Sequence, residues 1–388
     1  MMLTTKPQPY DSFLASCSTT QRNHQDSDDA ANERPWRRRP VVDSPNPPPR
    51  PDWLTQVREP SLAPDQKIVD AHHHLWDRRG FRYLLEEFTD DIGDSGHWVT
   101  ASIYIQCRTM YRASGPEAYR SVGEIEFVRG LSAQSRSGHY GPTDVATAIV
   151  GYADLLMGAS VAPVLEALME AGGGRFRGVR MPVAAHPDPT VRSNPVPAPE
   201  GLMVSKPFVE AARQLSRLGL SLDIWAYQTQ LDEVATLARR LPELTIVLDH
   251  AGGPLGVGSY PSPHSDHNSI HRQAWRDGLA RLAELPNVML KIGGFGMPIM
   301  GFSFNTGKTP PNSQHLADAI APDVDACIER FTPSRCMLES NFPVDKGSIS
   351  YGVLWNAYHR LTASWSQEER NAVFHDTATR VYRLPAGS

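Results

Sequence analysis

The stretch that decides the fold is Ile68–Asp77, IVDAHHHLWD, in which a short apolar run leads directly into three histidines. A short apolar run bounded by polar residues is typical of a buried strand. Side chains two positions apart in an extended segment point to the same side, so we expect His72 and His74 to converge while His73 faces away. The pattern predicts a strand that ends in a pair of imidazoles.

The same alternation continues along the chain, where β-rich apolar runs alternate with stretches of helical periodicity, as in βα units with a parallel sheet. The expected strands are Ile68–Ala71, Ala101–Gln106, Ala148–Tyr152, Phe176–Met181, Ser221–Trp225, Thr245–His250, Val288–Ile292 and Cys336–Ser340. The expected helices are Pro116–Arg136, Val161–Ala171, Ser205–Leu218, Gln230–Leu241, Ile270–Leu285 and Gln314–Phe331. The first crossover, Leu75–Val99, shows no clear amphipathic helix.

Eight strands with intervening helices predict an α/β fold, a single (β/α)8 TIM barrel that covers residues 48–388. An open doubly wound sheet is the competing architecture, but it needs a glycine-rich phosphate turn after its first strand, where this chain has histidines. Residues 1–47 are polar and end in a proline cluster, so we predict a disordered tail there.

Composition narrows the range of partners. Lys and Arg number 38 against 43 Asp and Glu, a net charge of −5, which argues against a nucleic-acid partner. The least polar region, Val145–Gly174, contains Asp154, Glu166 and Glu170, so we expect no membrane span. The four cysteines lie far apart without a CxxC spacing, which favours free thiols in a reducing compartment and predicts a cytoplasmic location.

Polar residues follow several of the expected strands, and catalytic residues of such barrels lie at the C-terminal ends of the strands. The sixth strand ends in Asp249 and His250, and the eighth continues into Glu339, Ser340, Asn341 and Asp345. Neutral imidazoles bind zinc, iron or manganese well, and a catalytic site usually has three protein ligands. We therefore take His72, His74 and His250 as candidate ligands of a divalent metal.

Substrate contacts are expected at the same rim. Gln106 and Arg180 stand at strand ends, and an arginine there suits a carboxylate or an oxyanion. Trp225 and Tyr227 end the fifth strand and suit a planar or apolar part of a ligand. Ordinary salt bridges and core packing are the alternative roles of these residues.

Together, these motifs resemble those of a known family. DAHHHLWD, FRGVRMPVA, LDHAGGPLG, NVMLKIGGFGMP and ESNFPVDK are similar, in content and order, to motifs of the amidohydrolase superfamily. The resemblance is to its TIM-barrel metal-dependent hydrolase branch, which includes sugar-lactone and 2-pyrone-4,6-dicarboxylate lactonases. It implies an HxH pair at His72 and His74, a further histidine at His250, and a last-strand acid that serves as ligand and general base.

The chain departs from the family at that acid. The usual aspartate, in a GSDWP-like context, falls on Asn341, which cannot accept a proton from a bound water. Asp345, four residues on, or Glu339, two residues back, are the two candidates to replace it. Some lactonases of this branch work without a metal, so a bound zinc or manganese and a metal-free site both stay open.

Three functions remain. The leading hypothesis is a hydrolase that opens a lactone or related cyclic ester, with water activated by His250 or Asp345. The second is a non-hydrolytic decarboxylase or lyase that acts on an aromatic or unsaturated carboxylic acid. The third is a barrel that binds a small molecule without catalysis. In each case the partner is a small molecule, and a homo-oligomer stays open.

Overall fold

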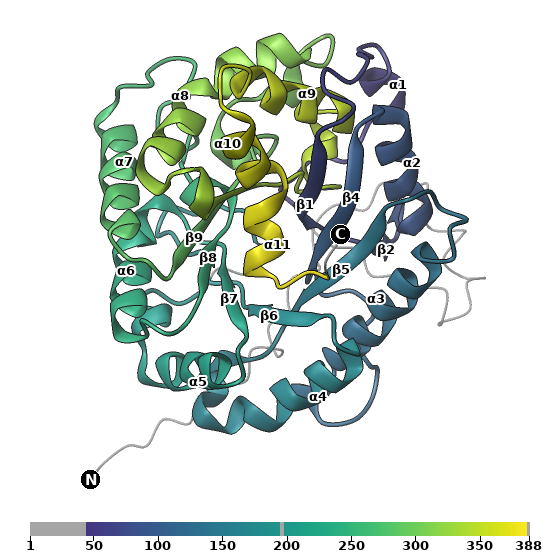
Figure 1. The fold of residues 1–388 in the computed structure, drawn as a ribbon. Coiled ribbons are helices and arrows are strands. Elements are labelled where there is room, and N and C mark those ends of the chain that lie inside the picture. Colours follow the sequence, from purple (N-terminus) through teal and green to yellow (C-terminus); the bar gives the residue numbers. More distant parts are fainter. Residues whose placement is uncertain (1–43, 195–197, 386–388) are drawn as a thin grey trace, which may run out of the picture. The chain divides into compact units, whose positions relative to one another are not determined.

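In the computed structural model, which describes residues 44–194 and 198–385, eight parallel strands form a nearly closed barrel surrounded by helices (Figure 1). The strands follow one another in chain order: β1 (Lys67–His73), β4 (Trp98–Ile105), β5 (Asp144–Gly151), β6 (Phe176–Arg180), β7 (Ser221–Ile224), β8 (Ile246–Leu248), β9 (Val288–Ile292) and β10 (Cys336–Leu338). A parallel bridge between His73 and Phe342 joins the first strand to the chain beyond the last. All eight predicted strands and the predicted barrel are confirmed.

The six predicted helices are also confirmed. They are α3 (Val122–Ser135), α4 (Ala162–Gly172), α5 (Lys206–Arg217), α6 (Leu231–Arg240), α7 (Ile270–Ala283) and α8 (Ser313–Phe331). Each follows a strand of the barrel, as the βα alternation predicts. A short α1 (Pro51–Leu54) precedes the barrel, and β2 (Trp76–Arg78) pairs with β3 (Phe81–Tyr83) in a separate hairpin.

The expectation of no amphipathic helix in the first crossover is wrong. Helix α2 (Leu85–Ser95) lies there and buries Leu85, Phe88 and Ile92, which are spaced along one face. These residues stand at i, i+3 and i+7 with acidic residues opposite, a regular amphipathic pattern that the prediction overlooked in a helix of only 11 residues that shares the crossover with β2 and β3. Three more helices follow the last strand: α9 (Tyr351–Leu361), α10 (Gln367–Asn371) and α11 (Thr377–Val381).

The core has two layers. One lies between the strands and the outer helices, and the other fills the barrel with small and branched side chains from alternating strand positions. The inner layer includes Val69, Ala71, Ala101, Ile103, Ile105, Ala148, Val150, Val247, Met289 and Met337. Ala378 of α11 and the nearby Tyr382 belong to it too, and Figure 1 shows α11 lying across the strands. The chain after α10 therefore closes one end of the barrel.

The apolar region that we examined for a membrane span is part of this outer layer. Residues 155–172 are long and apolar enough to cross a membrane by length and composition alone. In the structure they form η4 (Leu155–Val161) and then α4, with a break at Gly158, where φ is 61° and ψ is −142°. Leu155, Val161 and Leu165 are buried in the outer core, so the stretch packs as a helix of the barrel.

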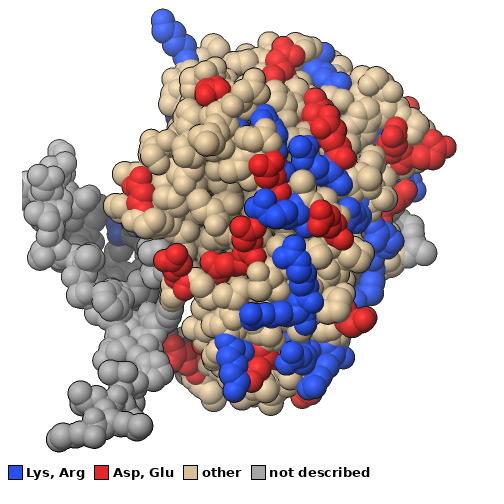
Figure 2. Space-filling model, turned by 90° about the vertical axis from the view of Figure 1, so that its left-hand side faces the viewer, with Lys and Arg blue, Asp and Glu red and all other residues tan. Residues whose placement is uncertain are grey.

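Charged side chains of both signs alternate on the face shown in Figure 2. Such mixing is typical of a solvated protein surface. Cys107, Cys327 and Cys336 are free thiols, as predicted, whereas Cys17 lies outside the described residues. The predicted disordered tail falls largely on residues 1–43, which also lie outside them.

Candidate active site

The triple histidine lies at an irregular point of β1. The register between β1 and β4 shifts between Asp70 and His73, and such a bulge reverses the in-and-out alternation of a strand. Val69 and Ala71 point into the barrel, yet the next side chain toward the site is His72 rather than His73. The Nε2 atoms of His72 and His74 are 3.3 Å apart, whereas His73 stacks on Phe88 of α2. The predicted convergence of His72 and His74 is therefore present.

His250 and Glu339 face this pair from the ends of β8 and β10. His250 has a left-handed backbone with φ at 53°, which is uncommon for a residue with a side chain and often marks a functional site. Its Nδ1 lies 2.6 Å from Glu339 Oε1, and the other carboxylate oxygen lies 2.9 Å from Nδ1 of His72. One buried carboxylate thus contacts two of the three candidate histidines.

The partners of the rings fix where their protons lie. A carboxylate and a carbonyl can only accept, so Nδ1 carries the proton in His250, which faces Glu339, and in His74, which faces the Ile105 carbonyl at 2.7 Å. His72 Nδ1 lies 2.9 Å from Glu339 and 3.5 Å from the Lys291 ammonium, and the nearer acceptor together with the Arg180 donor at its Nε2 favours the same tautomer. Burial lowers the pKa of His72 and His74, which favours these neutral forms.

A chain of buried ions runs beneath the histidines. Lys291 of β9 places its Nζ 2.8 Å from Asp223 Oδ2 and 3.0 Å from Asp249 Oδ1. Asp223 also accepts a hydrogen bond from the Tyr382 hydroxyl, at 2.5 Å. These charges have no access to solvent, so each carboxylate depends on the ammonium group for compensation.

Arg180 lies at the end of β6, above this chain. Its NH1 is 3.2 Å from His72 Nε2 and 3.4 Å from Asp249 Oδ2, and its NH2 donates to the Gln106 carbonyl at 2.7 Å. Among the described residues, three of the five N–H donors of Arg180 are thus engaged, so two remain for a ligand. The side-chain oxygen of Gln106 is buried without a hydrogen-bond partner in this part of the chain, so both predicted residues have polar capacity at the site.

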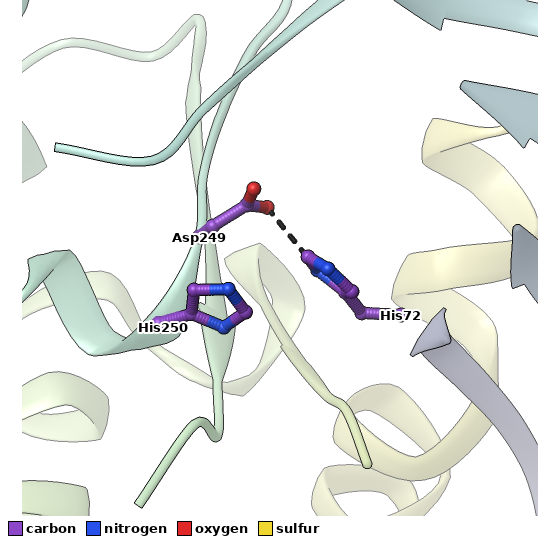
Figure 3. A group of neighbouring side chains, drawn as sticks. All are labelled: His72, Asp249 and His250. Carbon is purple, nitrogen blue, oxygen red and sulfur yellow. Dashed lines mark ion pairs between the residues drawn. The ribbon is translucent and has the colours of Figure 1, made fainter. Parts of the chain in front are cut away.

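The site has donors that fit a divalent metal. His72, Asp249 and His250 have ligand atoms within 4.8 Å of one another (Figure 3). His74 also fits, because two nitrogens bound tetrahedrally to zinc at about 2.05 Å lie roughly 3.3 Å apart, as the Nε2 atoms of His72 and His74 do. Arg180 NH1 reaches the Nε2 of His72, and a cation between the two rings would serve the Nε2 of His74 as well. Asp249 already has two cationic partners, so the histidines are the stronger part of the donor set.

Asn341, at the expected position of the last-strand acid, and Asp345, one of the two candidates to replace that acid, form a pair of their own. Asn341 Nδ2 donates to Asp345 Oδ1 at 2.8 Å, and Gly296 N donates to the other oxygen at 2.9 Å. Burial raises the pKa of Asp345 to about 7. The described residues show no hydrogen bond from either side chain to a site histidine, whereas Glu339 makes two.

The two predicted aromatic contacts differ in position. The Trp225 ring meets the His250 ring edge to face at 4.7 Å, so it lies at the site. Tyr227 instead accepts from Ser193 N at 2.9 Å through its hydroxyl, and Trp225 Nε1 donates to the hydroxyl of the same serine. Both aromatic residues therefore also hold the segment around Ser193 in place.

The sequence predicted Glu339 as one of two candidates for the missing acid, but it gave no role to Asp249, Lys291 or Asp223. A usable signal exists for three of them. Asp249, Lys291 and Glu339 each stand two positions after an inward-facing residue, namely Val247, Met289 and Met337. Side chains at that spacing share a face, so all three point into the barrel.

A cavity of about 270 Å³ lies away from these residues, between α1, α2 and α9. Its lining includes Arg58, Asp91, Lys346 and Tyr351, and it contains no predicted site residue. This cavity is therefore separate from the candidate site at the strand ends.

Comparison with known proteins agrees with this architecture. An uncharacterized protein, y4mH, of Sinorhizobium fredii is 29% identical over 342 residues, which cover 82% of this chain and 99% of that protein. An L-fucono-1,5-lactonase of Burkholderia multivorans is 25% identical over 82% of this chain and 96% of its own. The crystal structure of an amidohydrolase from Burkholderia multivorans with bound zinc matches with a TM-score of 0.62 and 23% identity, over 82% of this chain and 99% of that one.

The family model described as amidohydrolase matches residues 69–384, from the first strand to the segment that closes the barrel. This range includes every residue of the site. The chain therefore belongs to the amidohydrolase family.

Proposed function

We propose that this protein is a hydrolase that opens a lactone or a related cyclic ester by attack of water at the barrel mouth. The observation that carries the proposal is the His250–Glu339 pair beside Arg180, which supplies a held imidazole and an oxyanion donor in one buried site. The similarity to an L-fucono-1,5-lactonase supports a sugar lactone as the substrate class.

His250 is the residue best placed to activate water. Its Nδ1 proton is held by Glu339 at 2.6 Å, so its Nε2 can accept a proton from water as the water oxygen attacks the lactone carbonyl carbon. The arrangement is that of a base whose orientation is fixed by a carboxylate. When the tetrahedral intermediate collapses, the bond to the ring oxygen breaks and the same imidazole returns the proton to that oxygen.

Arg180 would stabilise the charge that develops on the carbonyl oxygen. Its remaining N–H donors belong to a guanidinium group that His72, Asp249 and Gln106 already orient, so little reorganisation is needed. Trp225, against the His250 ring, would limit where the lactone ring lies. A divalent metal held by His72 and His74 would supply further polarisation of the carbonyl or of water and would leave His250 Nε2 free to act as the base.

The test is turnover of a panel of sugar 1,4- and 1,5-lactones, followed by acid release, with product analysis in ¹⁸O-labelled water. The proposal expects one ¹⁸O atom in the carboxylate of the product. Release of carbon dioxide without solvent oxygen would establish the decarboxylase alternative, which the amide at Asn341 favours. Binding of a lactone without turnover would point to a non-catalytic barrel.

A separate measurement addresses the metal. Elemental mass spectrometry of protein purified without chelators is expected to find about one equivalent of zinc or manganese, and His74→Ala is expected to lose it. His73→Ala is the matched control, because that ring faces α2 and not the site. A cytoplasmic location is part of the same proposal.

A further inference from the structure

Glu339 is the carboxylate that joins two histidines of the site. It follows β10, is fully buried, and lies within 2.9 Å of both the His72 and the His250 ring. The main-chain N–H of His250 also donates to it at 3.2 Å.

The neighbouring strand makes room for this side chain. A Cβ atom on Gly293, just after β9, would lie 2.3 Å from Glu339 Cγ, closer than any real contact allows. The next residue, Gly294, has φ at 74°, and a Cβ there would lie 2.9 Å from the Cβ of His250. Two consecutive glycines thus form a slot for the Glu339–His250 pair, which is independent evidence that the carboxylate belongs there.

We propose that Glu339 is the positioning residue of the site: it holds His72 and His250 with Nδ1 protonated, so that the Nε2 of His72 accepts from Arg180 and the Nε2 of His250 faces the substrate. The role in turnover rests on the proposed function, because His250 is the base there. The arrangement of protons does not, and it can be measured in the absence of any substrate.

Only a carboxylate can serve both rings in this way. It offers two acceptor oxygens: Oε1 accepts from His250 Nδ1 at 2.6 Å, and Oε2, which has no other hydrogen-bond partner among the described residues, lies 2.9 Å from His72 Nδ1. A glutamine of the same shape offers one acceptor and one donor, so one of the two imidazoles has to turn its proton to Nε2. Glu339→Gln therefore keeps the packing of the slot but converts one Nε2 from an acceptor to a donor.

Asp345 provides the matched control. It is also fully buried and lies in the same segment, but its oxygens accept from Asn341 and Gly296 rather than from a histidine. Asp345→Asn therefore removes a buried negative charge near the site without changing a contact of either ring.

The experiment is two-bond ¹⁵N–¹H spectroscopy of the full chain with ¹⁵N-labelled histidine, in which the His72 and His250 signals are assigned from single His→Gln variants. The expected result is Nδ1–H for both rings in the unsubstituted protein and in Asp345→Asn, and Nε2–H for one of them in Glu339→Gln. Gly293→Ala, which fills the slot, should disturb the signals of the same two rings.

An Nε2–H form of either ring in the unsubstituted protein would overturn the inference, even if the glutamine variant failed to fold. Unchanged tautomers in a folded Glu339→Gln would do the same. If the tautomers are as expected and no lactone is turned over, the proposed function fails and the assignment of Glu339 as the residue that sets the two tautomers stands. If the protein turns over lactones but its histidines have other tautomers, the proposed function stands and the assignment of Glu339 fails.

Discussion

Glu339 and Asp345 are two buried carboxylates of one short segment, yet their environments shift their pKa values in opposite directions. Burial raises the pKa of both, but beside Glu339 the contacts with His250 and His72 overcome this effect and lower the pKa to about 2. Asp345 has only a main-chain N–H and the Asn341 amide as direct partners, and its pKa rises to about 7. Burial alone does not decide the charge of an acid; its partners do.

The difference also separates their roles. A carboxylate that stays ionised can hold two imidazoles in fixed tautomers, as Glu339 does. A carboxyl group that exchanges its proton near neutral pH cannot do so over a wide pH range. Asp345 instead ties Asn341 to Gly296 and so links the ends of β10 and β9.

The largest expected effect comes from removing the positive charge of Lys291, which lies beneath the histidines that Glu339 contacts. Lys291→Met leaves Asp223 and Asp249 buried without their ammonium partner. We expect a loss of about 5 kcal/mol in the free energy of unfolding, the upper end for breaking a buried pair, measured by urea denaturation. Lys206→Met, at an exposed pair, should change it by less than about 0.5 kcal/mol. A loss below about 1 kcal/mol for Lys291→Met would show that the chain of ions is not what compensates these acids.

The second effect concerns Asp345 and is a change in the free energy of unfolding with pH. Its folded pKa of about 7 lies above the ordinary value of 3.8, so the folded protein keeps a proton that the unfolded chain gives up. Stability should therefore fall as pH rises from 4 to 7, by about 4 kcal/mol in total from this group. Asp345→Asn should remove that decline in urea denaturation at pH 5, 6, 7 and 8.

Glu339→Gln is the control for this slope, because the Glu339 pKa of about 2 lies below the window. It should keep the decline between pH 4 and 7. Equal slopes in the unsubstituted protein and in Asp345→Asn would contradict the raised pKa of Asp345.

A smaller effect tests why residue 341 is an asparagine. Asn341→Asp would set a carboxylate against Asp345 where an amide now donates at 2.8 Å. We expect a loss of about 2 kcal/mol at pH 8 and less at pH 5, where the two acids can share a proton. The double variant Asn341→Asp, Asp345→Asn restores a donor and an acceptor and should recover most of the loss. No recovery would mean that the pair is not a hydrogen-bonded unit.

The smallest effect concerns a third buried acid. Burial raises the pKa of Asp70 to about 6, and its partners are neutral, including the Tyr351 hydroxyl at 3.1 Å. Tyr351→Phe should cost about 1 kcal/mol at pH 7, the value of one hydrogen bond. A thermal or urea measurement that finds more than about 3 kcal/mol would place Tyr351 in a role beyond this bond.

Much of this could be predicted from sequence. The eight strands follow from apolar runs, and the approach of His72 to His74 follows from their spacing. The bulge in β1 could not be predicted, because it depends on the register between β1 and β4. Glu339 and Asp345 were equal candidates for the missing acid, since their directions depend on the slot at Gly293 and on the turn after Asn341. Helix α2 was overlooked although its apolar residues are regularly spaced, because it has only 11 residues and shares the first crossover with the β2–β3 hairpin.

The central claim is that Glu339, and not Asp345, is the acid on which the site depends. The most direct measurement compares kcat/KM of Glu339→Gln and Asp345→Asn on the best lactone of the panel, at a pH where both are folded. The account predicts a loss of at least about 100-fold for Glu339→Gln, because a histidine takes the wrong tautomer, and a change within about 5-fold for Asp345→Asn. A larger loss in Asp345→Asn than in Glu339→Gln would contradict it.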